Sequence, residues 1–281
     1  MSTDREWEKW GEQDPYFGVI TDPRFRKGEI TSEVKHEFFF SGRVHVDHVL
    51  ASCRKYIESS FAPRRVLDFG CGVGRLLLPF AAVAEAVVGV DISEAMLREA
   101  RRNCDEHEVM NVTLACSDDA LSAVQGAFDL VHSAIVLQHI DPDRGLRIVE
   151  RLIGLLAPKG IGALQLTYGK AYHADTLGVV PPAKAQVPSV AAPQPERRPA
   201  PWFKWSRARP SEAAAMSSPS VAAAPDEQQS IQVNRDPEML MNPYNLNALF
   251  FLLQRAGVTD FHTEFTDHGG ELGIFLFFRK P

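Results

Sequence analysis

Hydrophobic residues along the chain gather into short apolar runs that are separated by polar or helical stretches. Such runs predict five strands, at residues 66–69, 87–91, 111–115, 128–133 and 163–167. Two further strands are expected near residues 260–265 and 273–278, after a helix over residues 244–256. Strands that alternate with helices predict a doubly wound α/β domain.

A helical pattern lies before the first strand. Residues 45–57 predict an amphipathic helix, whose apolar face consists of Val46, Val49, Leu50, Cys53 and Ile57. The segment before this helix is rich in aromatic side chains, which include Trp7, Trp10, Tyr16, Phe17, Phe25, Phe38, Phe39 and Phe40. Any one of these aromatics is equally consistent with capping the edge of the sheet and with shaping a binding pocket.

Residues 173–235 lose the apolar pattern. Between residues 181 and 230 lie ten of the chain's 19 prolines and twelve alanines. Such a segment does not bury enough apolar surface to offset its ordering entropy, so we expect a disordered insertion. Within it, Trp202–Arg209 combines aromatic and basic side chains. Two interpretations stay open: a short motif that contacts a partner or a membrane surface, or a hydrophobic cluster without a role.

The run after the first strand carries the candidate chemistry. It begins with Asp68 and has a glycine at every second position from Gly70 to Gly74, and another acid, Asp91, ends the next strand. The dinucleotide fingerprint G-x-G-x-x-G has its third glycine one place later, where this chain has Arg75. A carboxylate beside the loop repels a pyrophosphate and attracts a cation. The run therefore favours a cationic cofactor without phosphates over NAD, the alternative being a glycine-rich turn with two solvated acids.

This arrangement resembles motif I of the class I methyltransferases, whose cofactor S-adenosyl-L-methionine carries an ammonium and a sulfonium and no phosphate. The resemblance covers residues 60–168 closely and resumes over residues 244–279. It implies a Rossmann-like seven-stranded sheet, with five parallel strands, an antiparallel hairpin strand pair, and helices on both faces. It also implies that Asp91 accepts the two ribose hydroxyls, as the acid about 20 residues downstream does in dinucleotide folds.

The family places a further acid after the third strand, where it accepts the exocyclic amine of adenine. Asp118 is the preferred candidate and Asp119 the second, and a helix N-cap is the alternative role for either one. The cofactor-binding set that the resemblance implies is Asp68, Gly70, Cys71, Gly72, Gly74, Asp91, Ile92, Met96, Asp118, Asp119 and Ser133. The Cys71 thiol is expected to pack inside the loop and not to act as a nucleophile.

His139 is the candidate catalytic residue. It follows the fourth strand, where many small-molecule O-methyltransferases have a histidine assigned as the base. Because a hydroxyl is a poor nucleophile at neutral pH, a base with a pKa near 6.5 assists methyl transfer to oxygen. A structural role, in which His139 bonds backbone carbonyls and holds its loop, remains the alternative.

Other features of the sequence disfavour nucleic-acid bases and amides as the methyl acceptor. Enzymes that methylate bases or amides carry an Asn/Asp-Pro-Pro-Tyr motif after the fourth strand, whereas Asn242-Pro243-Tyr244 lies late in this chain and is expected to start a helix. No metal pattern is seen among the acids, histidines and four cysteines, and a net charge of −6 argues against nucleic acid as a partner. No apolar run reaches the roughly 18 residues of a membrane span, and no secretory signal is seen. A cytoplasmic location is expected.

The sequence thus predicts an S-adenosylmethionine-dependent O-methyltransferase that acts on a small hydroxylated acceptor such as a sugar, lipid or secondary metabolite. The alternative is a cofactor-binding scaffold or regulator without turnover, which acts through the insertion. The expected organisation is an aromatic and helical lid at 1–60, the methyltransferase core at 61–172, the disordered insertion at 173–235, and a helix with the last two strands at 236–281.

Overall fold

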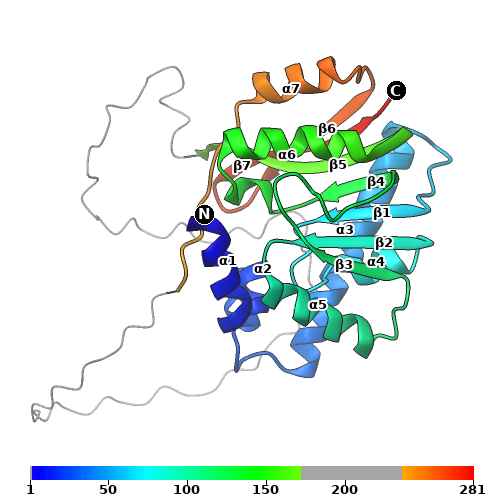
Figure 1. The fold of residues 1–281 in the computed structure, drawn as a ribbon. Coiled ribbons are helices and arrows are strands. Elements are labelled where there is room, and N and C mark those ends of the chain that lie inside the picture. The colour runs from blue at the N-terminus through cyan, green and yellow to red at the C-terminus, as the bar shows by residue number, and fades with distance from the viewer. Residues whose placement is uncertain (1, 172–235) are drawn as a thin grey trace, which may run out of the picture. The chain divides into compact units, whose positions relative to one another are not determined.

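The computed structural model describes residues 2–171 and 236–281 of the chain (Figure 1). The predicted insertion at 173–235, with the motif Trp202–Arg209, lies outside the described residues, so the predictions made for it remain predictions. No helix in the described ranges combines the length and the apolar character needed to cross a membrane.

One mixed sheet of seven strands organises the core, in the order β3-β2-β1-β4-β5-β7-β6. Strands β1 to β5 are parallel, and β7 pairs antiparallel with both β5 and β6. The strand bounds are β1 Arg65–Phe69, β2 Ala86–Asp91, β3 Val112–Cys116, β4 Phe128–Ser133, β5 Leu156–Lys170, β6 Phe261–Asp267 and β7 Glu271–Arg279. This arrangement confirms the predicted fold class.

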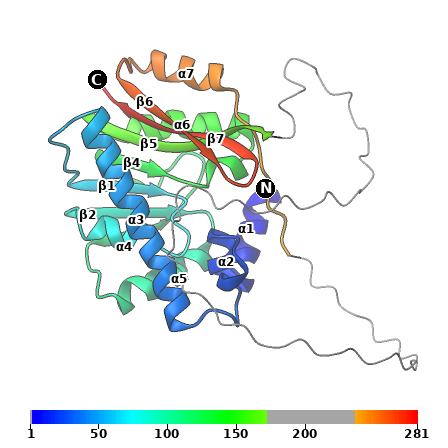
Figure 2. The same ribbon diagram turned by 180° about the vertical axis from the view of Figure 1, so that it is seen from behind.

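Helices cover both faces of the sheet (Figures 1 and 2). The helix bounds are α1 Ser2–Gln13, α2 Pro15–Val19, α3 Ser32–Tyr56, α4 Leu77–Ala81, α5 Glu94–Glu106, α6 Pro142–Leu155 and α7 Leu246–Arg255, with short 3-10 turns η1 Pro23–Phe25 and η2 Leu137–His139. Alternate residues of β1 divide between the two cores: Leu67 packs with α6 and α7, and Val66 packs with α3 and α4. Figure 2 shows α3 crossing its face of the sheet diagonally.

Two helix predictions need correction. The helix expected at residues 45–57 begins at Ser32, because Thr31 caps it by accepting a hydrogen bond from Val34 N, at 3.3 Å, and the triple phenylalanine run lies inside it. The late helix begins at Leu246, with Asn245 as its cap, so residues 242–244 do not start a helix.

The aromatic residues of the N-terminal segment pack mainly against one another. Trp10, Tyr16, Phe25, Phe38 and Phe39 form one buried cluster, which reaches the core through Val73 and Met96. Tyr16 and Phe25 both make edge contacts with Phe38, at ring-centroid distances of 5.1 Å. The segment is therefore a small hydrophobic core of its own, and it holds α1 and α2 at the sheet edge where the parallel strands end (Figure 1).

Candidate functional site

The glycine loop between β1 and α4 is held by backbone bonds to the neighbouring strand. Gly70 N and Cys71 N both donate to Val90 O on β2, at 2.8 and 3.0 Å. Gly70 and Gly72 have positive φ angles of 74° and 51°, a region that side chains disfavour. A Cβ on Gly70 would lie 2.3 Å from a methyl carbon of Val136. The loop therefore requires glycine for its backbone conformation and for its close approach to the loop after β4.

A cleft of about 960 Å³, open solvent at its mouth included, lies over this loop. It brings together most of the residues that the sequence singles out: Asp68, Gly70, Cys71, Gly72, Asp91, Ile92, Met96, Asp118, Asp119 and His139. Gly74 and Ser133 do not line it. A Cβ on Gly74 would meet Ala100 of α5 at 3.5 Å, and Ser133 Oγ donates to Phe69 O at 3.0 Å. Both residues thus support the floor of the cleft from behind.

Asp68 is buried, with 2% of its surface exposed. One of its oxygens, Oδ1, accepts a hydrogen bond from His132 Nδ1 at 2.8 Å, and the two residues are register partners on β1 and β4. His132 Nε2 in turn lies 3.0 Å from His45 Nε2 on α3, so one of these two nitrogens carries the shared proton. The second oxygen, Oδ2, is buried and has no hydrogen-bond partner. Buried carboxylate oxygens are seldom left unpaired, so Oδ2 indicates a position for a ligand's donor.

Asp91 lies at the end of β2, facing the loop. Its oxygens accept hydrogen bonds from Gly72 N at 2.8 Å and from Ser93 N at 2.9 Å. A carboxylate has about four acceptor positions, so two remain after these bonds. Burial raises the pKa of Asp91 to about 6, and the two backbone donors limit that rise. The group is therefore mostly ionised at neutral pH.

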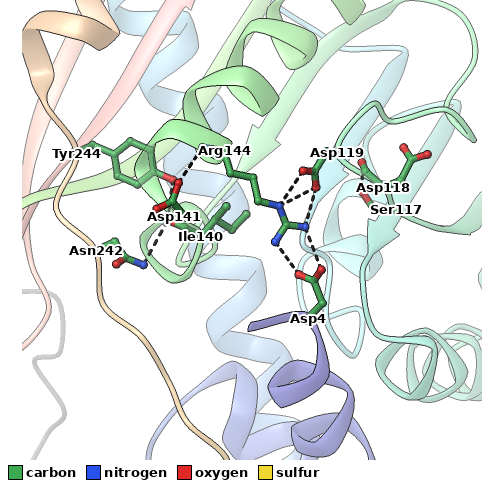
Figure 3. Close-up of polar contacts among 9 residues, drawn as sticks. All are labelled: Asp4, Ser117, Asp118, Asp119, Ile140, Asp141, Arg144, Asn242 and Tyr244. Atoms are coloured by element: carbon green, nitrogen blue, oxygen red, sulfur yellow. Dashed lines mark hydrogen bonds and ion pairs between the residues drawn. The ribbon is translucent and has the colours of Figure 1, made fainter. Parts of the chain in front are cut away.

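The two acids after β3 are engaged differently (Figure 3). Asp118 accepts from Ser122 N at 2.8 Å and from Ser122 Oγ at 2.5 Å, and its side chain points away from Arg144. Asp119 faces Arg144, whose Nε donates to both of its oxygens, at 2.7 and 2.9 Å. Asp118 has no cationic partner among the described residues, whereas Asp119 is neutralised by a guanidinium.

Cys71 packs inside the glycine loop. The residue is 4% exposed, and a Cβ on Gly89 of β2 would lie 3.0 Å from its sulfur. Burial, and then the nearby charge of Asp91, raise the pKa of the Cys71 thiol well above its usual value. A thiol in that environment is not a nucleophile at neutral pH.

His139 lies at the end of η2, beneath α1. Its Nδ1 donates to Leu240 O at 2.6 Å, which leaves the lone pair on Nε2. The Trp7 ring of α1 lies 4.9 Å from the imidazole, centroid to centroid, with the planes tilted by 59°. Burial lowers the pKa of His139 to about 4, so the ring is neutral at neutral pH.

Helix α1 covers the cleft and is tied to it through its side chains Asp4 and Glu8. Arg144 of α6 donates through its two terminal nitrogens to Asp4, at 2.7 and 3.2 Å, while it also holds Asp119 (Figure 3). Glu8 accepts from Ser93 Oγ at 2.7 Å and from Ala95 N at 3.2 Å. Arg144 therefore joins three chain segments, and the sequence analysis did not identify it, because helix positions alone do not reveal which side of α6 faces the cleft.

Residues 236–244 run beside the cleft and are bonded to η2. Asn242 N donates to Gln138 O at 2.7 Å, and the Tyr244 hydroxyl donates to Leu137 O at 2.8 Å (Figure 3 shows both side chains). These bonds hold η2 and therefore His139. The string predicted to start a helix is instead a strap across the loop that carries the candidate base.

Residues 66–160 match the family described as methyltransferase domain. Over 135 residues the chain is 29% identical to a ubiquinone biosynthesis O-methyltransferase from Nitrobacter winogradskyi, covering 46% of this chain and 50% of that protein. Over 107 residues it is 37% identical to a trans-aconitate 2-methyltransferase from Methylobacterium radiotolerans, covering 37% and 38%. The chain thus spans about half the length, or less, of these curated relatives.

Two solved structures are similar in fold over the full length. Magnesium protoporphyrin IX methyltransferase from Synechocystis PCC 6803 with bound SAM gives a TM-score of 0.57 at 16% identity, covering 100% of this chain and 98% of that one. An N-methyltransferase from Bradyrhizobium japonicum WM9 in complex with S-adenosyl-L-homocysteine gives 0.53 at 13% identity, covering 100% of both chains. At such identities the likeness concerns the fold.

Proposed function

We propose that this chain, whose core is a class I methyltransferase domain, uses S-adenosyl-L-methionine to methylate a hydroxyl group of a small acceptor. The single observation that carries the proposal is the cleft itself. It lies at the carboxyl ends of β1 and β2 and presents one buried acid, Asp68, which has an unpaired oxygen, and one partly buried acid, Asp91. Open α/β sheets bind their ligands at this edge.

The residues of the cleft fit this cofactor. Asp68 Oδ2 would accept from the ammonium of the methionine moiety, and the two free acceptor positions of Asp91 would take the ribose hydroxyls. Ile92 and Met96 offer apolar surface to the adenine ring, and Asp118 offers an acceptor for its amine. Gly74 and Ser133, which do not line the cleft, would act only through the shape of the loop.

S-adenosylmethionine supplies an activated methyl group on a sulfonium, so the protein has to align the acceptor and exclude water. Trp7 lines the cleft beside His139, and the strap at residues 236–244 holds η2 in place there. The neutral imidazole with its lone pair on Nε2 is in the correct form to accept a proton from an acceptor hydroxyl. Because burial lowers its pKa to about 4, the imidazole is a weak base, and the structural role of His139 in holding its loop is the competing assignment.

Two substitutions at His139 test the base against the structural role. His139→Ala should leave the affinity for S-adenosylhomocysteine near normal and reduce turnover by about a hundredfold or more. His139→Asn has an amide nitrogen at the position of Nδ1, so it can still donate to Leu240 O, but it does not accept a proton at neutral pH. Equal loss in both variants supports the base. Turnover that returns in His139→Asn assigns His139 to holding its loop.

Two measurements distinguish a methyltransferase from the competing function, a scaffold that binds the cofactor without turnover. Calorimetric titration with S-adenosylhomocysteine measures binding, and transfer of a tritiated methyl group to sugar, phenol and acid acceptors measures turnover. Binding without transfer to any acceptor would favour a scaffold that acts through the insertion, and through Trp202–Arg209 in particular.

We also propose a reducing, cytoplasmic setting. All four cysteines are free thiols, and Cys53, Cys71 and Cys104 are buried. Free buried thiols are typical of proteins that fold where glutathione and thioredoxin keep cysteine reduced.

A further inference from the structure

Strand β6 is one edge of the sheet. It is the last strand in the sheet order, and it pairs with β7 over all seven of its residues without a bulge (Figure 1). Among residues 2–171 and 236–281, no strand other than β7 forms backbone hydrogen bonds with it. The outer row of N–H and C=O groups of β6 is therefore available to pair with a further strand.

This edge lacks the features by which protein sheets block such pairing. The strand contains no proline, no lysine and no bulge. An inward-facing charge is another blocking feature, but the charge of Glu264 is already compensated. Its two oxygens lie 2.7 Å from Ser52 Oγ and 2.7 Å from His48 Nε2, both on α3. Extension of the sheet therefore does not bury Glu264 without partners.

Apolar side chains gather at the same edge. Eight large apolar side chains are exposed among the described residues, and three of them lie on β6 or in contact with it. Phe261 and Phe265, on one face of the strand, are 50% and 82% exposed. On the other face, the exposed ring of Tyr56 stacks on His262 with ring centroids 3.6 Å apart. Exposed aromatic surface on an unpaired strand is typical of a protein contact.

Two copies of β6 complement each other in one antiparallel register. A two-fold axis perpendicular to the sheet keeps the two faces separate, so the register has to be centred on a residue. Centring on Thr263 places Phe261 opposite Phe265 on one face. On the other face it places His262 opposite Glu264. Aromatic pairs, threonine pairs and oppositely charged pairs are the cross-strand contacts that stabilise antiparallel sheets.

The pairing of His262 with Glu264 also satisfies an orphaned atom. His262 Nε2 is buried and has no hydrogen-bond partner in the described structure, and it lies 3.6 Å from the Glu264 carboxylate of its own chain. A carboxylate has about four acceptor positions, of which Ser52 and His48 use two. Glu264 of a second copy can therefore accept from this imidazole.

The neighbouring registers are less favourable. Centring on Glu264 places this carboxylate opposite its own copy, and like charges directly opposite each other are destabilising. Centring on Phe265 places Thr263 opposite Asp267 and leaves Phe261 beyond the paired residues. Only the register about Thr263 gives both phenylalanines an aromatic partner.

We propose that the chain forms a homodimer in which two copies of β6 pair antiparallel about Thr263 and join the two sheets into one. Backbone hydrogen bonds supply affinity, and the alternating side chains fix the register. Strands β4, β5 and β7 lie between β6 and β1, where the cleft is located. The dimer therefore does not depend on the proposed activity.

Sedimentation velocity of the full chain over a range of concentrations measures the dimer. Phe265→Lys should raise its dissociation constant about tenfold or more, because each dimer loses two aromatic pairs and gains charges at the edge. Met110→Lys is the matched control. It also replaces an exposed apolar side chain, 92% exposed between α5 and β3, and should leave the dissociation constant unchanged. Both variants should bind S-adenosylhomocysteine as wild type does.

Cross-linking tests the register. Cys116 is the exposed thiol among the four cysteines, so the introduced cysteines are placed in a Cys116→Ser background. Thr263→Cys brings two sulfurs within disulfide range across the axis, and mild oxidation should cross-link the dimer. Phe265→Cys should not cross-link, because its two copies lie about 14 Å apart along the strands.

Each contrary result overturns the proposal. A wild type that stays monomeric at every concentration leaves the edge to a different occupant. A Phe265→Lys variant that dimerises as tightly as wild type places the contact elsewhere, and equal weakening in Met110→Lys makes the effect one of added charge. Cross-linking through Phe265→Cys in place of Thr263→Cys assigns another register. If circular dichroism shows that Phe265→Lys does not fold, the two cysteine variants decide.

Discussion

The floor of the cleft and its cover are built from different interactions. In the floor, defined as residues 68–74 with Asp91, backbone amides of the glycine loop bond the adjacent strand. In the cover, defined as α1, most ties are side-chain bonds between segments far apart in the sequence, such as Arg144 with Asp4. Those ties are partly exposed, and exposed ion pairs contribute little stability each. The difference teaches that the donor pocket is fixed by the sheet, whereas access to it depends on contacts that open at low cost.

The largest expected effect comes from breaking the floor at Gly70. Gly70→Ala places a Cβ against Val136 and forces a side chain into a positive-φ conformation. Left-handed backbone costs about 1–2 kcal/mol and overpacking about 1–3 kcal/mol, so unfolding free energy should fall by about 2–5 kcal/mol. Denaturant unfolding measures the loss, and S-adenosylhomocysteine affinity should fall with it. Gly169→Ala is the matched control, because its Cβ would meet no atom within 4 Å. If Gly70→Ala were as stable as wild type, the floor would not be rigid.

A smaller effect is expected from opening the cover at Arg144. Arg144→Met removes the bridge between Asp4 and Asp119, and it leaves two carboxylates close together at the mouth of the cleft. S-adenosylhomocysteine should bind about tenfold more weakly, mainly through faster dissociation, which stopped-flow fluorescence measures. Limited proteolysis should cut within α1 sooner than in wild type. Arg147→Met, exposed on the same helix, is the control. Unchanged dissociation and proteolysis would show that Glu8 and Trp7 suffice to hold α1.

The smallest expected effect is a pH dependence of ligand binding, which tests the role of Asp91 in the floor. Because the pKa of Asp91 is raised to about 6 in the protein without ligand, its carboxylate gains a proton as pH falls from 7 to 5. S-adenosylhomocysteine affinity should therefore decrease by up to about tenfold over that range. The same raised pKa contributes stability that is present below pH 3.8 and lost as pH rises through 6, opposite in sign to the binding change. Asp91→Asn should bind weakly at every pH; a wild-type affinity that stays constant from pH 7 to 5 would contradict the ionised carboxylate as the ribose acceptor.

The positions of the strands along the chain and of the acids at their ends were predictable because they follow from local patterns. Apolar runs of strand length, an acid at the end of each of two strands, and alternate glycines are visible within 26 residues of sequence. Parallel neighbours bring their carboxyl ends together, so Asp68 and Asp91 had to meet at one edge. The helix bounds at Ser32 and Leu246 were less predictable, because the caps Thr31 and Asn245 override the apolar periodicity used to place them.

The partners of the charged residues were not predictable. Asp118 and Asp119 are adjacent in sequence, yet one accepts from a nearby serine and the other binds an arginine of α6. The sequence pattern shows His132 only as part of the strand predicted at residues 128–133, although it is the residue that holds Asp68. In the sequence, Arg75 is notable only because it occupies the position of the third glycine of the dinucleotide fingerprint. Its burial beneath α3 is visible only in the fold.

The sequence by itself determined the sheet, the glycine loop and the acids at its edge, because periodicity, backbone conformation and strand ends are properties of neighbouring residues. Only the tertiary structure decided that Arg144 ties α1 to the cleft, that residues 236–244 strap His139 in place, and that Arg75 is buried beneath α3. Each of these depends on the meeting of segments that lie far apart in the sequence. Burial and pairing of charges are set by such meetings, which no local pattern encodes.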